Sequence, residues 1–159
     1  MKIAAVILIL ATFILAQAPA PKKGAKPKMA TARGTFDVKV VPTGTHHKDP
    51  AYGRYYSDKV YHGDLEGTAI GEMLAAGTGA AGTSGAYVAM ERVTGKLNGH
   101  LGSFTLYHSG SMEPGKMSME VNVVPGSGTD ELTGITGKLT IIIEGKQHSY
   151  EFEYTLPPK

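Results

Sequence analysis

The chain contains no cysteine and no tryptophan among its 159 residues. Without cysteine it can form no disulfide, no thiol nucleophile and no cysteine-ligated zinc site, so the fold must be stabilised by its core. The roughly 125 residues that follow the N-terminal region are enough to bury such a core. The lack of tryptophan weighs against lipocalin-type and avidin-type barrels, which rely on that residue.

Motifs that identify common enzymes are absent as well. The chain has no GxSxG nucleophile motif, no HExxH zinc motif and no phosphate-binding loop. The glycine-rich segment 77–86 (GTGAAGTSGA) does not fit a dinucleotide fingerprint, because no strand–helix–strand unit surrounds it. We therefore predict no cofactor and no metal site.

The first 18 residues have the composition of a signal peptide. Lys2 supplies a positive charge, residues 3–15 form a largely apolar run, and Ala16-Gln17-Ala18 has the small residues that signal peptidase recognises. The apolar run is too short to cross a bilayer of about 30 Å as a helix. The sequence therefore predicts an exported protein, periplasmic or secreted. Because Pro19 follows the cleavage site and hinders cleavage, retention of the segment as an anchor stays open.

Residues 19–33 (PAPKKGAKPKMATAR) contain five basic residues and no acidic one. With so few large apolar side chains, this segment predicts a disordered basic linker before a folded domain over 34–157. Association with an anionic envelope surface is the alternative role for the linker. From Gly34 onward, ten Lys and Arg stand against fourteen Asp and Glu, so the folded part is acidic. That balance argues against a nucleic-acid partner.

Glycine divides the folded part into short segments. Sixteen of the 21 glycines fall between Gly63 and Gly137, and they separate runs rich in Val, Leu, Tyr, Thr and Ile. No stretch after residue 20 shows helical periodicity. Strand character is found at 36–40, 55–62, 63–77, 86–93, 102–109, 117–124, 139–144 and 148–156. We predict an all-β fold: a single small antiparallel β-barrel of about eight strands.

Several of these strands are apolar on both faces. Residues 141–143 are three consecutive isoleucines, and GEMLAAG and AYVAM are also largely apolar throughout. A small barrel buries only its inner face, so apolar residues on both faces favour an oligomer. We expect a homo-oligomer, either a dimer or a trimer.

Two carboxylates lie in otherwise nearly uncharged strand segments. Glu72 is within AIGEMLAAG, and Glu91 is within GAYVAME. A carboxylate inside a barrel would have a raised pKa and would suit general acid or base chemistry. Tyr87 lies four residues before Glu91, on the same strand face, and could orient it. The alternative is that Glu72 faces water and that Glu91 pairs on the outside with Arg92 or Lys96.

Two histidines complete the candidate set. His108 shares one strand face with Phe104 and Leu106, so it is the third acid–base candidate if that face lines the lumen. We assign Tyr87, Phe104, Leu106 and His62 to ligand binding. His62 alternates with Asp64 and Glu66 as a metal trio would, but Gly63 is expected to break that alternation.

Four stretches resemble a bacterial family of domains of unknown function, number 3224: GDLEGTAIGEMLAAG, GAYVAMERVTGKLNGHLGSFTLYHSG, VVPGSGTDELTGITG and HSYEFEYTL. The likeness runs over nearly the whole of Arg33 to Leu156. That family is similar in fold to the allene oxide cyclase and dirigent barrels, which implies a six- to eight-stranded barrel with an apolar cavity, often dimeric or trimeric. The resemblance transfers no catalytic residue, because neither set of acids aligns by motif with Glu72, Glu91 or Asp64.

Three functions are consistent with these features. The first is binding of a small apolar molecule in the barrel lumen, oriented by the few polar side chains there. The second is a cofactor-free isomerase or cyclase, in which one carboxylate moves a proton while the cavity holds the substrate. The third is a structural or oligomeric interaction protein with a filled lumen. The residues do not settle whether the protein is an enzyme.

Overall fold

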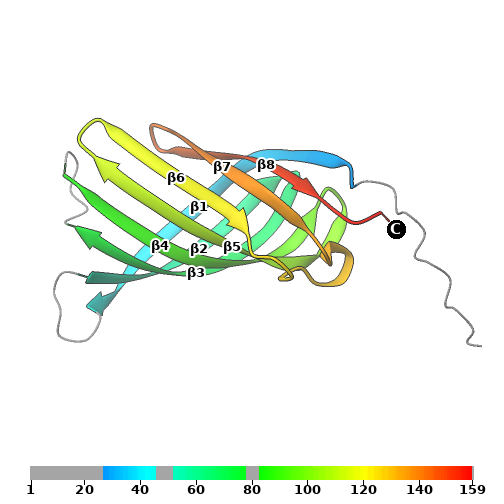
Figure 1. Cartoon of the computed structure of the whole chain (residues 1–159), viewed down its shortest axis with the longest axis horizontal. Helices are drawn as coiled ribbons and strands as arrows, with labels where there is room; N and C mark the ends of the chain where they lie inside the picture. The colour runs from blue at the N-terminus through cyan, green and yellow to red at the C-terminus, as the bar shows by residue number, and fades with distance from the viewer. Residues whose placement is uncertain (1–26, 46–51, 78–82, 159) are drawn as a thin grey trace, which may run out of the picture.

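In the computed structural model, which describes residues 27–45, 52–77 and 83–158, eight antiparallel strands close into one barrel (Figure 1). The elements are β1 (Met29–Thr45), β2 (Tyr52–Gly63), β3 (Leu65–Gly77), β4 (Gly85–Leu97), β5 (His100–Glu113), β6 (Lys116–Val123), the 3-10 helix η1 (Asp130–Leu132), β7 (Thr136–Glu144) and β8 (Gln147–Thr155). Each strand pairs with the next along the chain, and β8 pairs with β1 to close the barrel. The prediction of an all-β barrel of about eight strands is confirmed.

One end of the barrel is packed solid with apolar side chains. Phe104 of β5 and Phe152 of β8 stack inside it with ring centroids 5.5 Å apart. The segment that joins β6 to β7 packs against this end, with Leu132 and Ile135 buried (Figure 1). The β5–β6 and β7–β8 turns lie at the opposite end. We call these the packed end and the open end.

Glycines on the inner face let neighbouring strands approach closely. Gly67 of β3 lies directly opposite Gly95 of β4. A Cβ at Gly67 would lie 2.3 Å from the carbonyl oxygen of Thr94, and one at Gly95 would lie 2.2 Å from that of Glu66. No other residue type fits without moving the backbone, so the glycines allow the tight curvature that an eight-stranded barrel requires.

Strand β1 begins before the expected start of the folded domain. It starts at Met29, and its first residues pair with β8, from Met29 opposite Thr155 to Thr35 opposite Ser149. The end of the segment expected to be a linker is therefore part of the sheet, and Ala32 is fully buried there. The sequence of this stretch carries no strong strand signal, so the predicted start of the strand is too late.

The signal peptide and most of the basic linker lie outside the described residues, so export and envelope association stay predictions. Residues 46–51 and 78–82, which include half of the glycine-rich segment 77–86, also lie outside them. Within the described ranges, no helix is long and apolar enough to span a membrane.

Candidate functional site

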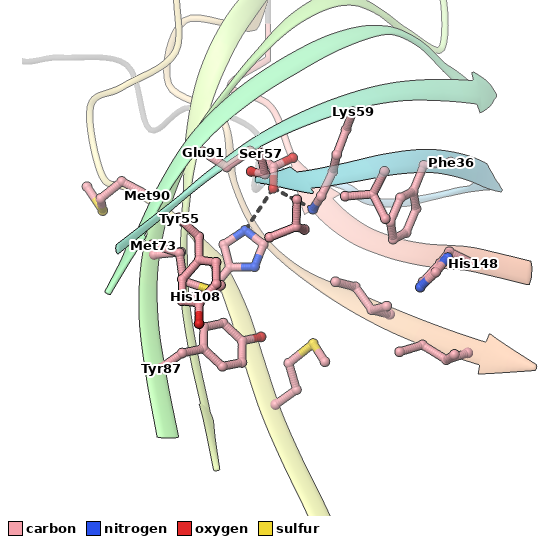
Figure 2. Close-up of a pocket in the computed structure, with 16 residues that line it drawn as sticks. Phe36, Tyr55, Ser57, Lys59, Met73, Tyr87, Met90, Glu91, His108 and His148 are labelled. Atoms are coloured by element: carbon pink, nitrogen blue, oxygen red, sulfur yellow. Dashed lines mark hydrogen bonds and ion pairs between the residues drawn. The ribbon is translucent and has the colours of Figure 1, made fainter. Parts of the chain in front are cut away.

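A cavity of about 220 Å³ occupies the half of the barrel toward the open end. Most of its wall is apolar, formed by inward side chains such as Phe36, Val38, Met73, Met119 and Ile141. Polar side chains gather at its deep end and along one side, as Figure 2 shows. The inner face of the barrel is thus filled in one half and hollow in the other.

Glu91 of β4 is the centre of the polar group, and its side chain is only 3% exposed. Its Oε2 accepts a hydrogen bond from Lys59 Nζ at 2.5 Å, and its Oε1 accepts one from the Tyr61 hydroxyl at 2.7 Å. Both donors come from β2, which is separated from β4 by β3. The carboxylate is therefore held by a salt bridge and a hydrogen bond that span an intervening strand.

Small residues on β3 leave room for the side chains of β2 and β4 to meet across it. Gly71 lies opposite both Ser57 of β2 and Glu91 of β4, and Ala69 lies opposite Lys59. A Cβ at Gly71 would lie 2.7 Å from Ser57 Oγ and 3.5 Å from Glu91 Cβ. The absence of a side chain there leaves room for Lys59 to reach Glu91.

His108 of β5 approaches the same carboxylate from the other side. Its Nε2 lies 3.1 Å from Glu91 Oε2, and its side chain is 6% exposed. The distance suits a hydrogen bond, but the N–H direction does not point at the oxygen, so the buried Nε2 has no aligned partner among the described residues. The imidazole also lines the cavity (Figure 2). The ring therefore lies between the carboxylate and the lumen.

The surroundings of Glu91 keep it ionised. Burial by itself raises the pKa of Glu91, but the contacts with His108 and Lys59 outweigh burial and lower it to about 2. Lys59 Nζ also lies 4.9 Å from the centroid of the Phe36 ring, a cation–π distance. A buried salt bridge thus forms the deep end of the cavity at neutral pH.

The tyrosines around Glu91 remain neutral. Burial and the charge of Glu91 raise the pKa of Tyr61 well above its ordinary value, and the same two causes raise the pKa of Tyr87. The Tyr61 hydroxyl is already used in the bond to Glu91. Tyr87 lines the cavity, and its ring covers Gly110 of the neighbouring strand, where a Cβ would lie 2.3 Å from the ring. Its phenol is therefore a hydrogen-bond donor placed in the cavity wall.

Three of the residues predicted from sequence line the cavity, namely Tyr87, Glu91 and His108. Phe104 and Leu106 also point inward, but they are fully buried in the core and do not line the cavity. The prediction that they share one face with His108 matches the structure. Because neither residue lines the cavity, the structure does not support their assignment to ligand binding.

Glu72 and His62 lie on the outside of the barrel. Glu72 is 63% exposed and lies 3.6 Å from Arg54, and His62 is 53% exposed and lies 3.0 Å from Asp37. The cause is strand alternation, because Gly71 and Tyr61 point inward and their next neighbours must point outward. Neither residue joins Glu91, so the structure does not support Glu72 as an acid–base group or His62 as a ligand contact in the lumen.

The sequence interpretation missed Lys59 and Tyr61, the two residues that hold Glu91. A signal was present: Ser57, Lys59 and Tyr61 alternate along SDKVYHG and share a face. The expectation that lysine faces water and valine faces the core hides it. Here Val60 is 44% exposed and Lys59 is buried.

The outer surface of β3, β4 and β5 is apolar over several positions. The exposed side chains there are Ile70, Leu74, Val88, Met90 and Tyr107. They agree with the expectation of strands that are apolar on both faces. The homo-oligomer inferred from that pattern stays a prediction.

Comparison with known proteins places the folded part in a family. The sequence model of a family described as "Protein of unknown function (DUF3224)" matches residues 32–154. A solved structure of a protein of unknown function from that family, from Shewanella oneidensis MR-1, is 43% identical with a TM-score of 0.75, covering 83% of this chain and 100% of that chain. No curated protein matches the chain. The likeness to allene oxide cyclase and dirigent barrels stays a prediction.

Proposed function

The chain belongs to the DUF3224 family of proteins of unknown function, and from the geometry of its lumen we propose that it binds a small, mostly apolar molecule inside the barrel. The observation that carries the proposal is the half-hollow lumen, with an apolar wall and a buried polar group at its deep end. Ligand sites commonly combine a mostly apolar surface with a few fixed polar groups that orient the ligand.

The size of the cavity limits the ligand. Its volume of about 220 Å³ is below the range of roughly 300–1,000 Å³ typical of sites for drug-sized molecules. A molecule of one or two rings, or a short branched chain, suits this volume. Its apolar part would contact Phe36, Met119 and Ile141, while its polar end would lie near His108 and Tyr87.

The second candidate function is a cofactor-free isomerase or cyclase. It is favoured by the contact between Glu91 and His108, because a carboxylate beside an imidazole that lines a cavity can move a proton. The third candidate needs a lumen filled by side chains, and the cavity weighs against it. Product analysis separates the first two, since a binding protein returns its ligand unchanged and an isomerase returns a rearranged molecule.

A cavity-filling substitution tests the proposal. Ala89 points into the cavity, and Ala89→Phe would occupy it; Val88 is the next residue on the same strand, faces outward and is 57% exposed. Solvent extracts of both purified variants and the wild type would be compared by mass spectrometry. We expect Ala89→Phe to lose a small molecule that the wild type and the matched control Val88→Phe retain. Equal retention by both variants, with both folded by circular dichroism, would contradict lumenal binding.

A further inference from the structure

The two ring nitrogens of His108 face different surroundings. Nε2 lies 3.1 Å from Glu91 Oε2, whereas the other side of the ring faces the cavity (Figure 2). In the neutral tautomer that carries its proton on Nε2, that proton lies on the nitrogen nearer the ionised carboxylate of Glu91. That tautomer leaves an unshared electron pair on Nδ1, on the side of the lumen. In that tautomer the ring presents a basic nitrogen to the cavity, with the carboxylate of Glu91 on its other side.

The ammonium of Lys59 and the carboxylate of Glu91, which lie beside this base, offset each other before a ligand enters. Among the described residues that line the cavity, Lys59 and Glu91 form a salt bridge with each other. The other titratable groups there are Tyr55, Tyr87, His108 and His148, and Tyr61 lies behind Glu91. An anionic ligand entering alone would bring a net charge into this buried space, which is costly. A neutral molecule would not.

We propose that the lumen takes a small apolar molecule carrying one weakly acidic hydroxyl group, a phenol or an enol, and that this hydroxyl gives its proton to His108 Nδ1. The inference rests on the proposed binding function. The O–H bond of the ligand breaks, its electron pair stays on the oxygen, and an N–H bond forms at Nδ1. The products are a phenolate or enolate and an imidazolium. No outside proton donor or acceptor takes part.

Two neighbours stabilise the ion pair that this transfer creates. Glu91 Oε2 faces Nε2 of the imidazolium and so lowers the energy of its positive charge. Tyr87 lies two residues before Ala89, which is directly opposite His108 on the neighbouring strand, so the two rings are diagonal neighbours on the inner face. Its neutral phenol can donate a hydrogen bond to the anionic oxygen. A carboxylate ligand lacks this balance, because its binding would require uptake of a proton from solvent.

The probe for the test is 4-nitrophenol, whose anion absorbs at longer wavelength than the neutral phenol. It would be titrated into the full-length protein at a pH where the free phenol is mostly protonated. We expect a saturable rise of the phenolate band in the wild type. Calorimetry in buffers of different ionisation heats should show close to zero net proton exchange with solvent.

Histidine variants locate the accepting group. His108→Gln keeps a polar group but removes the base, and we expect it to bind the probe as the neutral phenol, about tenfold or more weakly. His148→Gln is the matched control, because His148 also lines the cavity but lies on β8, in contact with the Phe36 ring at 5.2 Å. It should keep the phenolate band. Nitrogen-15 NMR of the wild-type imidazole rings shows which histidine gains a proton when the probe binds, without a substitution that could affect folding.

Several results would overturn the inference. One is a phenolate band that persists in folded His108→Gln, and another is wild-type protein that binds the probe only as the neutral phenol. Benzoate that binds more tightly than the phenol, with uptake of one proton, would show a carboxylate site instead. If phenols fail to bind while Ala89→Phe still loses a co-purified molecule, this inference fails and lumenal binding stands. If Ala89→Phe changes nothing, the proposed function itself fails.

Discussion

Removing the positive half of the buried salt bridge should destabilise the barrel strongly. In Lys59→Met the apolar stem is kept, and the carboxylate of Glu91 loses the ammonium that lies 2.5 Å from it. The remaining contacts of Glu91 are the Tyr61 hydroxyl and the poorly aligned His108 ring. A buried charge that loses its partner typically lowers the free energy of unfolding by about 3–5 kcal/mol. We expect a loss in that range at pH 7.

The double variant Lys59→Met/Glu91→Gln measures how much of that loss is due to the unpaired charge. The amide of the new glutamine can still accept the hydrogen bond of Tyr61, and no buried charge is left without a partner. We expect the double variant to be more stable than Lys59→Met alone. The coupling between the two sites should be about 2 kcal/mol or more, because both groups are almost fully buried.

Urea unfolding of the four proteins of this cycle, followed by circular dichroism, gives the coupling free energy. The matched control is the outer pair of Arg54 and Glu72, whose side chains are 49% and 63% exposed. Its cycle, with Arg54→Met and Glu72→Gln, should give about 0–1 kcal/mol. If the inner and outer pairs give the same small coupling, the reasoning from burial is wrong.

Three further predictions follow from the same structure. The pKa of Glu91 is about 2 in the folded protein against an ordinary 4.5, which contributes about 3 kcal/mol to the free energy of unfolding. This contribution is complete above pH 4.5 and is lost as the pH falls toward 2 and below. Measurements of the free energy of unfolding against pH should show this loss in the wild type and not in Glu91→Gln. Gly67→Ala should destabilise the barrel more than Gly71→Ala. The methyl added at Gly67 would lie 2.3 Å from a backbone oxygen, whereas the methyl added at Gly71 would chiefly meet the Ser57 hydroxyl, 2.7 Å away. Equal urea midpoints for the two variants would contradict this. The predicted homo-oligomer is checked by analytical ultracentrifugation, where Met90→Glu on the apolar outer face should shift a dimer or trimer toward monomer, and a wild-type monomer would refute it.

The architecture could be predicted from the sequence because two simple signals agree. Glycine and turn residues mark the ends of the strands, and no helical period competes with them. The alternation in β8, with Tyr150, Phe152 and Tyr154 on one face, correctly identifies the inner side. The same period of two places Tyr87 on one face with Glu91, and His108 on one face with Phe104 and Leu106, but it does not say which face is inner. The position of one strand relative to the next does not follow from any single strand, so the distances between these residues could not be predicted.

The sequence left open whether Glu72 faces the lumen or water, because the ordinary hydrophobic rule is reversed in its strand. Ile70 and Leu74 are large and apolar, share a face with Glu72, and are exposed on the outside of the barrel. The inner face of the same segment carries Gly71 and Ala69, opposite the residues of the salt bridge. A sequence pattern that assigns the larger apolar residues to the core therefore selects the wrong face.

This reversal links the cavity to the apolar outer surface. The lumen is hollow beside β3 because glycine and alanine point inward there, and strand alternation then places Ile70 and Leu74 outside. Next to them, Val60 faces outward because Lys59 faces inward to meet Glu91. An inner cavity and an apolar outer face are thus two results of one arrangement of residues along β2 and β3.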